Sequence, residues 1–252
     1  MKILALDSSG LVASVAIVED DDLIAEYDIQ YKKTHSQTLL PMLDEIKKMI
    51  DLDMSSLDAV ALAAGPGSFT GLRIGSATAK GLGLALGIPI IEIPTLEGLA
   101  YNLYGTREYI CPIMDARRGQ VYTGVYEFVK NEDLEKDGYR LEEVDPQCAV
   151  GIEEIAERLN HFGREIIFLG DGVPVFRERL KLHMKVPYHF APAHLNRQRA
   201  ASVAALGGNY YKAGKSVDPK DHAPIYLRLS QAERERSEKE NKNEKMKIVN
   251  GE

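Results

Sequence analysis

The sequence predicts an α/β fold of two duplicated lobes, each a mixed sheet flanked by helices, with a reduced second lobe. Short apolar segments rich in β-branched residues alternate with segments of helical period. The order β-β-β-α-β-α begins near residue 2 and begins again near residue 109. Residues 58–64 (DAVALAA) are almost wholly apolar, which is typical of a strand buried on both faces of a parallel sheet.

The first lobe is expected over residues 1–105. Ser8, Ser9 and Gly10 form a turn between its first two strands, and EDDD forms the next turn. Thr34 or Ser36 is a candidate cap for the first helix, in which Pro41 predicts a kink or a late start. The predicted elements are strands 2–7, 11–18 and 23–30, helix 34–50, strand 58–64, helix 71–86, strand 88–93 and helix 94–104.

The second lobe is expected over residues 106–230, with the boundary near Gly105. Its predicted elements are strands 109–115 and 120–129, helix 152–162, strand 165–170, helices starting at 175 and 201, and a short closing element at 223–229. Residues 231–252 carry six acids and six bases and almost nothing to bury, so we expect a charged, disordered tail.

Composition excludes several classes of protein. A net charge of −7 makes the chain a poor nucleic-acid binder on its own, because binding phosphates requires clustered Lys and Arg. Two cysteines, Cys111 and Cys148, make neither a disulfide framework nor a metal cluster. No apolar run approaches the ~20 residues that a membrane helix needs, so we expect a cytoplasmic protein without a membrane partner.

A glycine-rich loop, GPGSFTGLRIG (65–75), directly follows the buried strand. A strand, a glycine loop and a helix N-terminus form a generic anion site. The specific motifs fail, because Thr70 stands where a dinucleotide fingerprint needs glycine and Leu72-Arg73 follow Gly71 where a Walker loop needs Lys-Ser/Thr. Candidates for a remnant anion site are Asp7, Ser8, Ser9, Gly65, Gly67, Ser68, Thr70 and Arg73. Asp7 has a structural alternative, an Asx-type turn with the serines that follow it.

Five stretches of the chain, HSQTLLP, GPGSFTGLRIG, AKGLGLALGIPI, PTLEGLA and DARRGQVY, resemble the TsaB (formerly YeaZ) family. The resemblance is strong over residues 1–128, thinner over 129–230 and absent from the tail. It implies an actin-like, ASKHA-type fold. It also implies a non-catalytic subunit required for N6-threonylcarbamoyladenosine (t6A) at position 37 of tRNA. That subunit would bind and activate the catalytic subunit TsaD, act alongside the ATPase subunit TsaE, and reach tRNA only through the complex.

The residues of a catalytic centre are missing. The related TsaD binds a metal through His-x-x-x-His, and the matching positions here are Thr95 and Leu99. The six histidines include no pair at helical i, i+4 spacing, so we expect no metal and no catalytic residue. Arg117 and Arg118 occupy the second hairpin turn, where actin-like ATPases have glycines. They are expected either to face solvent or a partner protein, or to contact a phosphate or carboxylate.

A row of small residues, Gly71, Gly75, Ala79 and Gly83, recurs every four positions along the helix after the loop. It either packs inside its own lobe against the helix bearing Leu39 and Leu43, or joins that helix and His35 in a surface for TsaD. Two other functions stay open: an actin-like ATPase or phosphotransferase, and a glycoprotease-like metallopeptidase. A homodimer and a nucleotide at a subunit interface also stay open.

Overall fold

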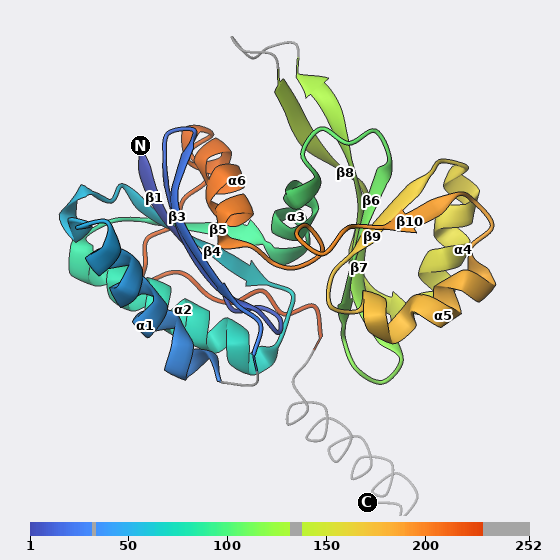
Figure 1. The fold of residues 1–252 in the computed structure, drawn as a ribbon, viewed down its shortest axis with the longest axis horizontal. Helices are drawn as coiled ribbons and strands as arrows, with labels where there is room; N and C mark the ends of the chain where they lie inside the picture. The colour runs from blue at the N-terminus through green and yellow to red at the C-terminus, as the bar shows by residue number, and fades with distance from the viewer. Residues whose placement is uncertain (32–33, 132–137, 229–252) are drawn as a thin grey trace, which may run out of the picture.

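The computed structural model describes residues 1–31, 34–131 and 138–228. Two five-stranded mixed sheets lie beside each other, each with helices packed on it (Figure 1). The predicted actin-like arrangement of two lobes is therefore confirmed. The charged tail expected at 231–252 lies outside the described residues.

The first sheet has the order β3-β2-β1-β4-β5. The hairpins β1–β2 and β2–β3 are antiparallel, whereas β4 and β5 run parallel to β1. The strands are β1 (Lys2–Asp7), β2 (Ala13–Glu19), β3 (Asp22–Ile29), β4 (Ala59–Gly65) and β5 (Ile90–Pro94). All seven residues of β4 are buried, as their apolar composition predicts.

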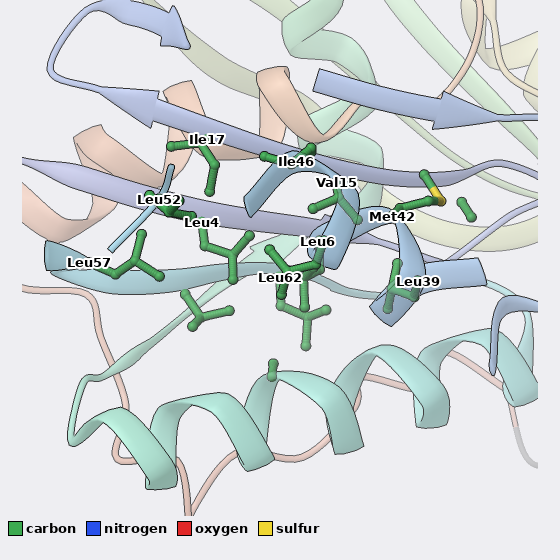
Figure 2. Packing of buried hydrophobic residues seen from close by; sticks show 14 of the residues in the cluster. Leu4, Leu6, Val15, Ile17, Leu39, Met42, Ile46, Leu52, Leu57 and Leu62 are labelled. Carbon is green, nitrogen blue, oxygen red and sulfur yellow. The ribbon is translucent and has the colours of Figure 1, made fainter. Parts of the chain in front are cut away.

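Helices α1 (His35–Met49) and α2 (Phe69–Leu86) pack on one face of this sheet. Figure 2 shows Leu39, Met42 and Ile46 of α1 directed at leucine and valine side chains of the strands. The expected late start is not seen: α1 begins at His35 and continues through Pro41, and Thr34 occupies the N-cap position without a side-chain cap. A 3₁₀ turn, η1 (Met54–Ser56), leads from α1 towards β4.

The second sheet has the order β10-β9-β6-β7-β8, with α4 (Ile152–Phe162) and α5 (Val173–His183) packed on it. Its strands are β6 (Tyr109–Asp115), β7 (Gln120–Asn131), β8 (Gly138–Gly151), β9 (Ile166–Leu169) and β10 (Tyr188–Phe190). The repeated β-β-β-α-β-α order implied a third strand before α4, but the sequence assigned no residues to β8, and it did not predict β10. The described residues of β8 are exposed or half-buried, so this strand carries no apolar alternation to reveal it.

Two helices pack across the expected boundary between lobes. α6 (Ala200–Lys212), expected in the second lobe, covers the other face of the first sheet. Conversely, α3 (Thr95–Ala100) and η2 (Tyr101–Leu103), expected in the first lobe, pack Leu96, Leu99 and Leu103 against β6 and β7. Each lobe thus receives a helix from the other half of the chain. The order of elements could not predict this exchange of helices, because the order does not say which sheet a helix covers.

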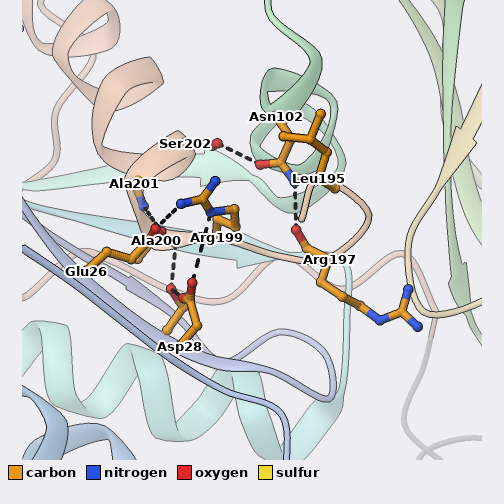
Figure 3. A network of polar contacts seen from close by, with 10 residues as sticks. Glu26, Asp28, Asn102, Leu195, Arg197, Arg199, Ala200, Ala201 and Ser202 are labelled. Atoms are coloured by element: carbon orange, nitrogen blue, oxygen red, sulfur yellow. Dashed lines mark hydrogen bonds and ion pairs between the residues drawn. The ribbon is translucent and has the colours of Figure 1, made fainter. Parts of the chain in front are cut away.

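Hydrogen bonds fix the crossing segment that leads into α6. The Nδ2 of Asn102 donates to the carbonyls of Leu195 at 2.9 Å and Arg197 at 2.6 Å (Figure 3). Arg199 pairs with Glu26, and that carboxylate also accepts the N–H of Ala201 at 3.0 Å. The first turn of α6 is thus anchored to the acidic side chains of β3.

Candidate functional site

A cleft of about 470 Å³ separates the two lobes at the position where the sequence placed a remnant anion site. One wall is formed by the β1–β2 turn and the start of α2, and the other by the β6–β7 turn and Asp171. Of the eight predicted anion-site residues, Ser9, Gly67, Ser68 and Thr70 line this cleft. The other four, Asp7, Ser8, Gly65 and Arg73, do not line the cleft, and each contacts another part of the protein.

The glycines of the loop pack against the protein's own backbone. A Cβ atom on Gly65 would lie 2.1 Å from the Ile225 carbonyl oxygen, and one on Gly67 would lie 2.3 Å from that of Ser9. Ser68 caps α2, because its Oγ accepts the N–H of Gly71 at 3.4 Å, and its own N–H donates to Ser9 at 2.7 Å. Glycine is required here for close packing of three chain segments. This loop has no need of a phosphate to explain its composition.

Asp7 and Ser8 are buried beneath the cleft. The Oδ1 of Asp7 accepts hydrogen bonds from the Ser9 N–H at 2.8 Å and the Ser9 hydroxyl at 2.6 Å, which is the Asx-type arrangement. The Ser8 hydroxyl donates to the carbonyl of Gly71 at 2.9 Å. Burial raises the pKa of Asp7 to about 6, against the opposing effect of the Ser9 hydrogen bonds.

The second lobe adds further acidic groups to the cleft. The N–H of Asp115 donates to Asp171 Oδ1 at 3.3 Å, and burial raises the pKa of Asp171. Arg117 and Arg118 are exposed on the turn, with left-handed φ values of 64° and 57°. Arg117 Nη1 lies 3.4 Å from Asp115 Oδ2. The cleft is thus lined by two carboxyl groups, those of Asp115 and Asp171, and by one guanidinium, that of Arg117.

Arg73 does not point into the cleft either. Its Nε donates to the Tyr226 hydroxyl at 3.2 Å, and its guanidinium lies 4.9 Å from the centre of the Phe69 ring. The rings of Phe69 and Tyr226 stack at 4.1 Å. Tyr226 belongs to residues 213–228, which we call the C-terminal strap. This segment forms no helix or strand, and its one β-bridge joins Val217 to Ile90.

The strap crosses α2 and β5 through a buried polar cluster that the sequence did not reveal. His222 Nε2 contacts the Ser76 hydroxyl, and its Nδ1 lies 2.5 Å from Glu92 Oε1. Lys80 Nζ donates to the carbonyl of His222 at 2.9 Å. Ser76 and His222 are 146 residues apart, so no local spacing could have predicted the pair. The His222 side chain is fully buried, which suits a structural tie and not a nucleophilic site.

The positions that match the TsaD histidines are filled by the core. The Thr95 hydroxyl accepts the N–H of Gly65 at 3.1 Å and is 1% exposed. Leu99 packs in the cluster of α3, β6 and β7. In the described part of the chain, no three His, Cys, Asp or Glu side chains converge as ligands of one metal ion. The absence of a metal from the working protein stays a prediction.

The row of small residues on α2 faces inward, as in the first of the two alternatives that the sequence left open. A Cβ on Gly71 would lie 2.0 Å from the Ser8 carbonyl oxygen, and one on Gly83 would lie 2.7 Å from Pro219 Cγ. Gly75 meets Ser8 and Leu62 in the same way. Ala79, Leu39 and Leu43 belong to the core of the first lobe, and His35 Nε2 lies 2.9 Å from the Gly10 carbonyl. Of the two alternatives that the sequence left open, the packing of these residues fits the one inside the lobe.

The opposite face of α2 is exposed to solvent, and like the inner face it carries mostly small side chains. Ala77, Gly81 and Leu84 lie on it, and a Cβ on Gly81 would meet nothing within 4 Å. α1 lies alongside (Figure 1) and contributes exposed Leu40. Both helices therefore expose apolar side chains on the outside of the first lobe, Leu40 on α1 and Leu84 on α2.

Among residues 1–31, 34–131 and 138–228, no helix combines the length and apolar character needed to cross a membrane.

Comparisons with known proteins agree with this fold. The family model described as "TsaD: tRNA N6-adenosine threonylcarbamoyltransferase" matches residues 23–236. The Bacillus subtilis tRNA threonylcarbamoyladenosine biosynthesis protein TsaB is 35% identical over 92% of this chain and 96% of its own. The Escherichia coli protein of the same name is 29% identical over 90% of this chain and 95% of its own.

The solved structure of YeaZ from Pseudomonas aeruginosa superposes with a TM-score of 0.73 at 28% identity, covering 90% of this chain and 99% of that one. A second Pseudomonas aeruginosa structure, described as similar to peptidase YeaZ, gives a TM-score of 0.72 at 26% identity with the same coverage. The sequence relatives are thus named TsaB and the structural neighbours YeaZ, which are two names of one family. The chain therefore belongs to the TsaB (YeaZ) family, within the wider group that the TsaD model describes.

Proposed function

We propose that this chain takes part in t6A biosynthesis as a non-catalytic subunit that binds the catalytic subunit TsaD and activates it. The relatives named for this pathway match nearly the whole length of the chain, which supports the pathway. The partners TsaD and TsaE come from the family resemblance. The acidic charge of the chain supports contact with tRNA through the complex and not by this chain alone.

The family model that matches this chain is described as a transferase, so catalysis by the chain itself is the competing function. Three observations favour a non-catalytic role. Thr95 and Leu99 are buried where TsaD has metal-binding histidines. The glycine loop is packed against Ser9 and Ile225, and the cleft carries acids where a polyphosphate would need donors.

The observation that carries the partner assignment is the exposed face of α1 and α2. Glycine inside a helix costs about 0.5–1 kcal/mol relative to alanine, and Gly81 has no internal neighbour that requires it. A bare surface lets a second helix approach closely and gain dispersion contacts along the backbone. Leu84 is 61% exposed beside it and would supply an apolar anchor. TsaD, as a relative with a lobe of the same kind, would present a matching pair of helices.

The test is reconstitution of tRNA modification with and without this chain, using the variant Ala77→Gln. Ala77 is exposed on α2, so the variant should melt like the parent, fail to co-purify with TsaD and fail to support modification. Ala205→Gln is the matched control, because Ala205 is exposed on α6 on the opposite face of the sheet. Normal modification by Ala77→Gln would refute the surface assignment. Modification by this chain without TsaD, or stoichiometric zinc or iron with ATP turnover, would refute the non-catalytic role.

A further inference from the structure

A groove of about 760 Å³ runs between strand β3 and helix α1, apart from both the interlobe cleft and the exposed face of α2. Its walls are mostly apolar. Tyr31, at 70% exposed, and Met49, at 75%, lie open at its margins, while Met42 and Ile46 form its floor. Exposed apolar side chains of this size gathered in one groove are typical of a binding surface.

The groove borders an open edge of the sheet. β3 is the last strand in the order β3-β2-β1-β4-β5, and within the described residues it pairs only with β2. An edge strand presents a row of backbone donors and acceptors that an extended segment can pair with. Two kinds of side chain alternate along it: Ala25 and Ile29 pack towards α1, whereas Glu26 and Asp28 face Arg199 before α6 (Figure 3).

The negative charge of the β3 edge favours a partner segment that carries basic residues. Residues 19–31 contain six acids and no base. Two such edges from two copies of the chain would repel each other, because like charges directly opposite across a sheet are destabilising. A strand that alternates basic and apolar residues would instead place its bases beside Asp28, whose side chain is 37% exposed, and its apolar side chains in the groove. Glu26 on the same face is already paired with Arg199.

We propose that the chain's own C-terminal segment, Lys245–Val249 (KMKIV), pairs with the outer edge of β3. Lys245 and Lys247 would lie on the acidic face of the strand, and Met246 and Ile248 would enter the groove against α1. This segment lies outside the described residues and beyond residue 236, where the family-model match ends. It is the one stretch of the tail in which bases alternate with large apolar residues.

The chain is long enough for this pairing within one molecule. Arg228 and Lys245 are 17 residues apart (245 − 228), which spans up to about 60 Å when extended. A folded body of this size is roughly 45 Å across. The end of the strap also lies on the α1–α2 side of the first sheet, where the groove is. Tyr226 stacks on Phe69 at the start of α2, and the start of α2 at Gly71 contacts His35 at the start of α1. The tethered segment would therefore reach the groove at a high effective concentration.

Amide hydrogen exchange tests the proposal on the intact protein. Residues 22–31 should exchange at least about tenfold faster in a chain that ends at Glu240 than in the full chain, because pairing protects the edge amides. Ile248→Asp should reproduce the deletion, since it would bury a charge in an apolar groove. Val249→Lys is the matched control, because this side chain would lie on the acidic face away from the groove, where a base leaves the pairing intact.

Exchange at residues 22–31 that is the same with and without the tail would overturn the proposal. Protection that depends on the tail but is lost on dilution, together with a dimer by light scattering, would overturn pairing within one molecule and assign the groove to the tail of a second copy.

A peptide of residues 241–252 added to the chain ending at Glu240 provides an independent measurement. Fluorescence anisotropy of the labelled peptide should show saturable binding, and Met49→Asp in the groove should weaken it about tenfold or more. Leu84→Asp, on the exposed face of α2, is the matched control and should leave binding unchanged. Equal weakening by both variants, or no binding to the parent chain, would refute the groove as the site.

Discussion

Asp7 is a carboxyl group that folding removes from water without giving it a positive partner. It keeps two hydrogen bonds from Ser9, yet burial and the nearby carboxylates of Asp28 and Asp171 still favour its protonated form. In an active phosphate site, such an acid would act with a metal ion. Here its hydrogen bonds to Ser9 shape the β1–β2 turn, on which Gly67 and Gly71 then pack.

This residue makes the stability of the protein depend on pH. The pKa of Asp7 is raised to about 6 when folded, against about 3.9 in an unfolded chain. Between these values the folded state holds a proton that the unfolded state has released. The contribution of Asp7 is therefore fully present below pH 4 and is lost as the pH rises through 6.

We expect Asp7→Asn to be more stable than the parent by about 1–3 kcal/mol at pH 7.5, because it keeps the hydrogen-bond acceptor and removes the buried charge. The difference should shrink towards zero near pH 4. Urea unfolding of both proteins at pH 4, 5, 6 and 7.5 measures it. A variant less stable than the parent at pH 7.5 would mean that the ionised carboxylate is needed in the fold.

At the scale of elements, α2 separates two surfaces that share the same kind of residue. Its inner side carries Gly71, Gly75 and Ala79 against Ser8, Leu62 and the core, and its outer side carries Ala77 and Gly81 without an internal neighbour. Both sides permit close approach of another chain segment. The sequence pattern alone does not tell the two sides of α2 apart. The burial of the inner side shows that it packs inside the lobe, whereas the exposed outer side is free to contact a partner protein.

A pair of substitutions two residues apart measures this difference. Ala79→Gln should lower the free energy of unfolding by about 1–3 kcal/mol, because Ala79 is fully buried and the larger amide would overpack the core. Ala77→Gln should change it by less than about 0.5 kcal/mol, because its side chain enters solvent. Thermal and urea melts of the isolated protein give both values. Equal destabilisation by the two substitutions would contradict the orientation of α2 seen here.

Local pattern predicted the elements whose burial is periodic and failed where burial is not. α1, α2, α4 and β4 have an apolar face or an apolar run, and each was predicted close to its observed position. β8 has neither, since it is held mainly by its backbone pairing with β7. Within the site, the Asp7 turn follows from three adjacent residues. The tie between Ser76, His222 and Glu92 depends on how the strap returns, which no local sequence pattern encodes.

The two lobes of the whole molecule each depend on a helix from the other half of the chain. α6 covers a face of the first sheet that includes Ile3, Ile91 and Ile93, and α3 packs Leu96 and Leu99 on the second sheet. The strap adds a further tie, since Arg228 Nη1 donates to the carbonyl of Ala116 at 2.7 Å. Folding of one lobe without the other would leave an apolar face exposed to water.

We therefore expect the full chain to unfold in a single calorimetric transition, with equal van't Hoff and calorimetric enthalpies, although a protein of two lobes often shows more than one transition.

A fragment of residues 1–105 and a fragment of residues 106–252 should each lack a cooperative melt, because each lacks a helix that its sheet requires. Mixed or co-expressed, the two fragments should assemble and regain it, since the chain between Leu103 and Tyr109 forms a surface connection outside the regular elements. A fragment of residues 1–105 that melted cooperatively alone would show that α6 is dispensable for the first lobe. Fragments that failed to assemble would show that continuity of the chain near Gly105 is needed for the exchange.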